Sequence, residues 1–134
     1  MTPLPFLDSS LGLPIKLRNP LLGVSHPREG NTIAVVDTGY SGFLLVQRRI
    51  FEKLKLHQLT TSVADAHLAD GRVIKLTRAP GSIRFDENSL TVDGLIDTHQ
   101  DVSEILIGMA GIRRLILTVD PCRRILLTDV CGNP

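Results

Sequence analysis

The sequence predicts a mostly β fold with one or two short helices, and three observations lead to that class. Apolar residues make up 43% of the 134 residues, while aromatic residues make up only 4%. Val, Ile, Leu and Thr are abundant, which favours strands. The apolar residues also occur in short runs separated by turn-forming residues. The length fits one domain that can bury its apolar surface without disulfides, so a single domain is expected over residues 1–134.

The expected strands follow one another with short turns between them. In order, they cover residues 15–18, 21–24, 33–36, 43–46, 62–68, 73–76, 82–85, 90–96, 105–107, 115–119 and 125–127. A short amphipathic helix is expected after the fourth strand, because Ile50 and Leu54 lie about one turn apart among charged residues. A helical turn is expected over 108–113. Residues 1–12 contain two prolines and are expected to form a flexible arm or an edge segment.

An acidic turn follows the expected strand 33–36. It reads Asp-Thr-Gly-Tyr-Ser-Gly and leads directly into the next apolar strand. Because both flanking strands are apolar enough for the core, Asp37 is expected at the mouth of the interior. Gly39 and Gly42 let another backbone approach the carboxylate, and the Thr38 hydroxyl can hydrogen-bond across a close contact. The alternative is an ordinary surface turn, since Asp, Thr and Gly are common turn residues.

The Asp-Thr-Gly turn resembles the catalytic turn of the aspartic proteases, particularly of their single-domain, retropepsin-like branch. Residues 104–109, Glu-Ile-Leu-Ile-Gly-Met, are similar to the apolar-apolar-Gly signature that follows the last core strand of that family. Between these elements, residues 69–71, Ala-Asp-Gly, resemble a turn of its microbial members. The similarity extends from about Leu13 to Asp129. It implies a closed β-barrel-like retropepsin fold and one retropepsin-like aspartic protease domain over residues 1–134.

The resemblance also implies a set of site residues. They are the catalytic Asp37, the turn-supporting Thr38, Gly39 and Ser41, and the substrate-binding or flap residues Tyr40, Ala69, Asp70 and Gly71. The flap would be the hairpin formed by the strands expected at 62–68 and 73–76, and the alternative is a plain surface hairpin. Two departures from the family are visible. Tyr40 stands where a small residue is commoner, and Ala110-Gly111 interrupts the sequence that usually follows the apolar-Gly signature.

Peptide hydrolysis of this type needs two carboxyl groups, one to take a proton from water and one, still protonated, to polarise the carbonyl. The chain contains one Asp-Thr-Gly, since Asp70-Gly71 and Asp93-Gly94 lack the hydroxyl residue and the preceding apolar strand. The second carboxylate is therefore expected from a second copy, in a symmetric homodimer. The expected function is an aspartic endopeptidase that activates water between two Asp37 carboxylates. The alternative is a catalytically silent module of the same fold that binds peptides or joins partners.

Charge and hydropathy narrow the expected partners. Fifteen basic and fourteen acidic residues give a net charge of +1, which provides no overall field for nucleic acid or an anionic membrane. No apolar run approaches the length of a membrane span, and no secretory signal pattern opens the chain, so a cytoplasmic location is expected. The expected partners are a peptide or protein substrate and a second copy of the chain.

One polar segment contains possible metal ligands. Asp97, His99 and Asp101 occupy alternate positions, which an extended segment would present on one face. No Cys, second His or closing ligand lies nearby, so residues 97–103 are expected to form a polar loop without a metal. No cofactor is expected.

Overall fold

The computed structural model describes residues 6–7, 10–67, 71–85, 90–119 and 125–129. Within them, nine strands form one mixed sheet, two strands form a separate ribbon, and two short α-helices are present. The elements are β1 (Phe6–Leu7), β2 (Ser10–Asn19), β3 (Val24–His26), β4 (Thr32–Val36), β5 (Leu44–Gln47), α1 (Arg48–Lys53), the 3-10 turn η1 (Leu56–Gln58), β6 (Ser62–His67), β7 (Val73–Phe85), β8 (Leu90–His99), β9 (Leu106–Ile107), α2 (Met109–Ile112), β10 (Leu115–Val119) and β11 (Ile125–Asp129). A mostly β class with short helices is therefore confirmed. Neither helix has the length and apolar character that crossing a bilayer requires, as far as the described residues extend.

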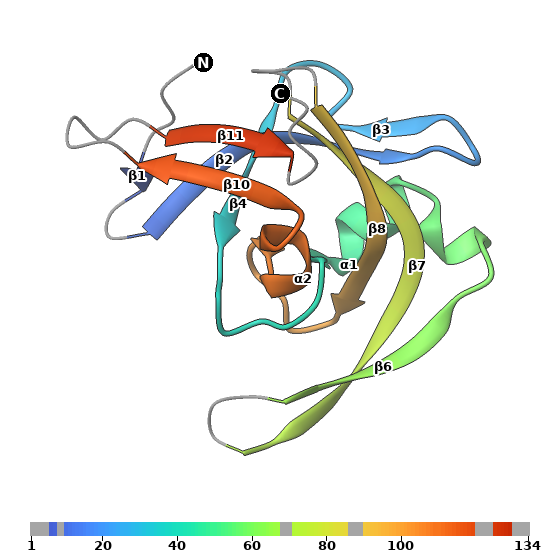
Figure 1. Cartoon of the computed structure of the whole chain (residues 1–134). Coiled ribbons are helices and arrows are strands. Elements are labelled where there is room, and N and C mark those ends of the chain that lie inside the picture. The colour runs from blue at the N-terminus through green and yellow to red at the C-terminus, as the bar shows by residue number, and fades with distance from the viewer. Residues whose placement is uncertain (1–5, 8–9, 68–70, 86–89, 120–124, 130–134) are drawn as a thin grey trace.

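The main sheet closes on itself through hydrogen bonds. Its strands lie in the order β1-β2-β4-β9-β5-β8-β7-β6, with β3 beside β2, and β2 also pairs with β7. A ring of paired strands, β2, β4, β9, β5, β8 and β7, results. Two of its pairings are parallel, β4 with β9 and β5 with β8. In Figure 1 the β6–β7 hairpin extends beyond the ring at the bottom, and the β10–β11 ribbon lies at the top.

Alternating burial along β2 shows how the sequence builds the core. Leu13, Ile15 and Leu17 are buried, while Lys16 is only half-buried and Arg18 is exposed. Successive strand residues point to opposite faces, so this alternation places one face of β2 on the interior. The strands β5, β7, β8 and β9 contribute further buried aliphatic and aromatic side chains to the same cluster. The core is therefore enclosed by the ring of strands.

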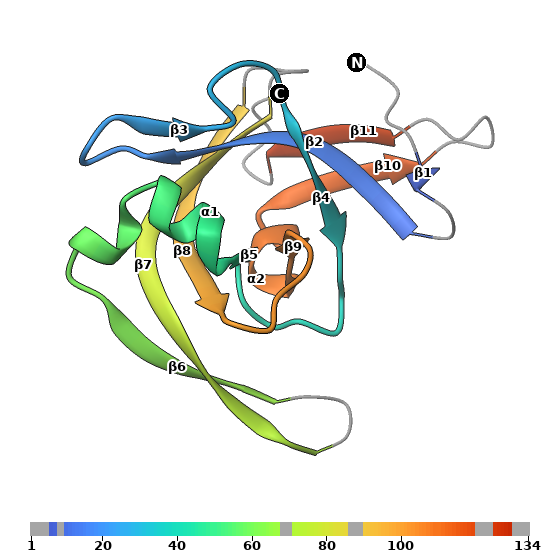
Figure 2. The same cartoon turned by 180° about the vertical axis from the view of Figure 1, so that it is seen from behind.

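Helix α1 covers part of this core from outside the ring. Its residues Ile50 and Phe51 are buried, as is Leu54 immediately after it. The helix contacts β5 and β8, and in the view from behind in Figure 2 it lies in front of β8. The spacing of Ile50 and Leu54 thus predicted the helix and its buried face correctly.

Several strand boundaries differ from the prediction, and three of the differences change an expected element. The strands expected at 73–76 and 82–85 are parts of one continuous strand, β7. The expectation of a polar loop over 97–103 is wrong at its start, because β8 continues to His99 and pairs with β5. The strand expected at 21–24 is mostly a turn that leads into β3. In each case long-range pairing, which a local pattern does not display, decided where the strand ended.

The beginning of the chain contributes strands where the structure describes it. β1 lies at one end of the sheet order, beside β2. Residues 10–12 belong to β2, and Gly12 pairs with Val35 of β4. The described part of the expected arm is thus in strands, one of them at an edge.

Asn19 fixes the turn after β2 from the inside. The side chain is completely buried, and its Nδ2 donates to the Leu54 carbonyl at 2.9 Å. Its Oδ1 accepts from the amides of Leu21 at 3.1 Å and Leu22 at 3.2 Å. One side chain therefore joins the β2–β3 turn to the segment that follows α1.

Asn19→Ala is expected to lower the free energy of unfolding by about 2–3 kcal/mol, because the Leu54 carbonyl loses a buried donor and two turn amides lose an acceptor. Chemical denaturation would measure the change. Asn31→Ala is the matched control, since Asn31 is exposed and should shift stability by less than about 0.5 kcal/mol. Equal stability of the two variants would contradict the bracing role of Asn19.

Candidate active site

The acidic turn is held by a strand inserted between its two flanks. β9 lies between β4, which enters the turn, and β5, which leaves it. The Asp37 amide donates to the Ile107 carbonyl at 2.9 Å, and the Gly108 amide donates to the Phe43 carbonyl at 3.1 Å. The apolar-Gly segment seen in the sequence thus bonds both ends of residues 37–43, which begin with the Asp-Thr-Gly turn. This pairing explains why the two segments are needed together although they are far apart in the chain.

The Asp37 carboxylate is oriented by its own turn. The side chain is half-buried, and the Gly39 amide donates to its Oδ1 at 2.9 Å. A Cβ at position 39 would lie 3.2 Å from that oxygen, so glycine permits the close approach. Among the described residues, no other group hydrogen-bonds to this carboxylate, which therefore keeps most of its acceptor capacity.

The buried side chain of Tyr40 anchors the turn to the interior. It is only 9% exposed, and its hydroxyl donates to the Asp97 carboxylate, with the Leu44 carbonyl at 3.3 Å as a second acceptor. Its carbonyl accepts from the Met109 amide at 2.7 Å. A Cβ at Gly108 would come within 2.6 Å of this carbonyl, and one at Gly42 within 2.8 Å of the ring. The Tyr40 backbone and ring therefore occupy space that only these two glycines leave open.

Asp97 is the buried centre of a charged network. It is completely buried on β8, and Arg78 of β7 donates to it twice, from Nε to Oδ1 at 2.7 Å and from Nη2 to Oδ2 at 3.0 Å. The pKa of Tyr40 is raised well above its ordinary value, first by burial and then by the hydrogen bond and charge of Asp97. The hydrogen bond to Asp97 also raises the pKa of Arg78. The raised pKa values keep the Tyr40 hydroxyl neutral and the Arg78 guanidinium charged at neutral pH.

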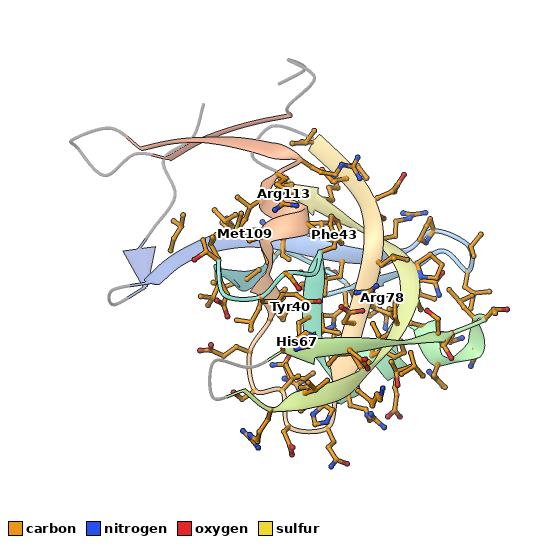
Figure 3. All side chains as sticks on the ribbon, turned by 60° about the horizontal axis from the view of Figure 1, so that its bottom comes forward. Tyr40, Phe43, His67, Arg78, Met109 and Arg113 are labelled. Carbon is orange, nitrogen blue, oxygen red and sulfur yellow. The ribbon has the colours of Figure 1, made fainter. Side chains whose placement is uncertain are left out.

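A cavity brings the turn and the hairpin together. Its volume is about 280 Å³, and it is lined by Asp37, Gly39, Tyr40 and Ser41 of the turn, Ala66, His67, Ile74 and Leu76 of the hairpin, and Leu45 and Leu106 at the base. Figure 3 shows the labelled Tyr40 and His67 close together on this side of the molecule. A larger hollow of about 670 Å³ lies between residues 23–28 and Lys53, and none of its described lining residues carries a carboxylate. The Asp37 cavity is therefore the candidate active site.

Only some of the expected site residues line the cavity. Four of them, Asp37, Gly39, Tyr40 and Ser41, line the one cavity. Thr38 is exposed beside it. Gly71 is exposed in the turn of the β6–β7 hairpin with φ +88°, a conformation that favours glycine, while Ala69 and Asp70 lie outside the described residues.

Sequence reasoning missed Arg78 and assigned Asp97 to a loop. The available signal was an acid directly after the apolar run that ends at Ile96, where a strand continued into polar residues. His99 and Asp101 are the other possible metal ligands of that segment. The Asp101 amide donates to His99 Nδ1 at 3.2 Å, and 3.8 Å separates that nitrogen from Asp101 Oδ2. Within the described ranges, no three His, Cys, Asp or Glu side chains gather as metal ligands.

Comparison with known proteins yields one informative match. The chain is 34% identical over 126 residues to a protein of Archaeoglobus fulgidus described as uncharacterized, and the match covers 94% of this chain and 98% of that protein. No family model matches the chain. No solved structure matches it either.

Proposed function

We propose that this chain, which belongs to the same family as the Archaeoglobus fulgidus protein, is an aspartic endopeptidase with a closed, retropepsin-like fold. The observation that carries the proposal is the position of Asp37. Its half-buried carboxylate, oriented by the Gly39 amide, lines a cavity that the β6–β7 hairpin borders on the other side. An acid in a cavity bordered by a hairpin suits general acid-base hydrolysis of a peptide held in extended conformation. We place this activity in the cytoplasm.

The proposed reaction uses two copies of Asp37. One carboxylate takes a proton from a water molecule while the other, protonated, donates to the carbonyl oxygen of the scissile bond. Asp37 is the only carboxylate among the described residues that line the cavity. The second group would come from a second copy across a two-fold axis, where each subunit presents the same surface. The exposed position of Thr38, next to Asp37, suits a contact between the two turns.

The cavity favours a substrate with apolar side chains in extended conformation. Aliphatic side chains surround much of the acid, and they come from Leu45, Ala66, Ile74, Leu76 and Leu106. β6 is the last strand in the sheet order, so one edge of it is unpaired among the described strands. A peptide backbone can hydrogen-bond to such an edge while its side chains enter apolar pockets. The hairpin that carries β6 would then act as the flap.

The test is cleavage of an unbiased peptide library by the purified chain, with and without the aspartic protease inhibitor pepstatin. Inhibitable cleavage that disappears in Asp37→Asn supports the proposal. Peptide binding without cleavage in the wild-type chain would instead support a catalytically silent binding module.

The rate of cleavage is expected to follow a bell-shaped pH profile centred in the acidic range. Two facing carboxylates in a partly desolvated site repel each other, so the first proton leaves easily and the second is held to higher pH. Activity requires the singly protonated pair, and the rate should fall on both sides of that state. Initial rates on one peptide from acid to alkaline pH would measure the profile. A flat profile would exclude a shared proton.

A further inference from the structure

We propose that Arg78, Asp97 and Tyr40 are positioning residues that couple the β6–β7 hairpin to the active-site turn. The inference rests on the proposed function, because it gives these residues an effect on the Asp37 reaction. In addition to that function, the network would fix the orientation of the Asp37 carboxylate. Of its three members, Tyr40 lines the cavity. Figure 3 labels two members of this network, Tyr40 and Arg78.

Arg78 stands where the hairpin joins the ring of strands. Across β7 it pairs with Ser62, the first residue of β6, and with Asp97 of β8. Residues of β7 before this point belong to the hairpin, and residues after it pair with β8. The Arg78 side chain is 28% exposed, whereas Asp97 is 0% exposed. The guanidinium therefore sits at the base of the hairpin and anchors it to a carboxylate inside the core.

The hydrogen bonds to the Asp97 carboxylate fix the relative positions of Arg78, Asp97 and Tyr40. Arg78 holds both carboxylate oxygens through two parallel hydrogen bonds, and Tyr40 adds a third donor. Charge-assisted, bidentate bonds are shorter and stronger than neutral ones, and a buried carboxylate is costly to leave without them. A displacement of the hairpin base must therefore either break these bonds or carry Tyr40 with it.

Backbone hydrogen bonds connect Tyr40 to the catalytic Asp37. Its amide donates to the Asp37 carbonyl at 3.3 Å, and the preceding amide, that of Gly39, donates to Asp37 Oδ1 at 2.9 Å. Gly42 and Gly108 pack closely against Tyr40 and confine its ring on those two sides. A movement of Tyr40 therefore changes where the Gly39 amide points, and with it the orientation of the Asp37 carboxylate.

Tyr40→Phe isolates the coupling from the packing. It keeps the ring between the two glycines and removes only the hydroxyl that reaches Asp97. We expect kcat to fall about ten-fold with a smaller change in KM, since a misplaced catalytic group costs rate more than binding. Amide hydrogen exchange in the β6–β7 hairpin should rise by about three- to ten-fold. Thr98→Val is the matched control, because its buried hydroxyl donates to the Val46 carbonyl at 2.8 Å outside the network. It should change neither quantity by more than about two-fold.

A spectroscopic readout tests the network without any assay of cleavage. The chain has one tyrosine and no tryptophan, so its ultraviolet titration reports Tyr40 alone. In Asp97→Asn the phenolate should form at a lower pH than in the wild-type chain, because the carboxylate that opposes ionisation is gone. Arg78→Lys is the second variant if Asp97→Asn does not fold, since a lysine keeps the charge but loses the bidentate geometry. Its hairpin should exchange faster than that of the wild-type chain.

These readouts separate the inference from the proposed function. Absence of cleavage in the wild-type chain would remove the protease proposal, yet the titration and hydrogen exchange would still show whether Asp97 connects Tyr40 to the hairpin. Hairpin exchange that is unchanged in both Tyr40→Phe and Arg78→Lys would overturn the coupling. So would an unshifted Tyr40 titration in folded Asp97→Asn.

Discussion

Asp37→Asn is expected to lower the rate of peptide cleavage by about 10³-fold or more while leaving the chain folded. The amide cannot take a proton from water or return it, and general acid-base catalysis alone contributes factors of about 10²–10⁴. The shape is retained, and the Gly39 amide can still donate to the side-chain oxygen. Stability should therefore change little, or rise, since two facing carboxylates no longer repel. Steady-state kinetics and thermal unfolding measure the two effects.

Asp101→Asn provides the matched control for this loss. Asp101 is an exposed carboxylate that does not line the cavity. Its variant should cleave at nearly the wild-type rate. Activity that survives in Asp37→Asn, or that falls equally in both variants, would place the catalytic group elsewhere.

Asp97→Ala is expected to lower the free energy of unfolding by about 3–5 kcal/mol, the largest stability change that the described interactions support. Removing the buried member of an ion pair leaves a largely buried partner, here the 28% exposed Arg78, without its compensating charge. Arg78 would lose both of its hydrogen bonds to Asp97, and the Tyr40 hydroxyl would lose its main acceptor. Denaturant unfolding of the full chain measures the change.

The control here is Asp101→Ala, four residues further along the chain. The Asp101 side chain is 81% exposed, so its removal should cost less than about 0.5 kcal/mol. A similar loss in the two variants would show that the buried network contributes no more than a surface charge.

The strands and the acidic turn could be predicted because their signals are local. Leu13, Ile15 and Leu17 alternate with more exposed residues, as a strand with one buried face requires. Ile50 and Leu54 lie one helical turn apart and are both buried. Asp37 follows four apolar strand residues directly, and the structure places it half-buried at the cavity. In each case neighbours within a few residues determined the outcome.

The network behind the turn could not be predicted, because its members are distant in sequence. Asp97 is 19 residues from Arg78 and 57 from Tyr40, and only their contact makes a buried aspartate tolerable. Pro80 and Gly81 look like a turn signal in the sequence, yet β7 continues through them. Pro80 is exposed and pairs in register with Leu95 of β8. Pairing across the ring, rather than local propensity, decided both features.

The proposed mechanism requires that two Asp37 carboxylates from two subunits form one catalytic centre. The direct test mixes wild-type and Asp37→Asn chains at fixed total concentration, under conditions that let subunits exchange, and measures the rate of peptide cleavage. Only dimers with two wild-type subunits should be active, so the rate should follow the square of the wild-type fraction. An equal mixture should then show about a quarter of the wild-type rate. A linear decrease, to about half, would show that each chain works alone and would contradict the shared centre.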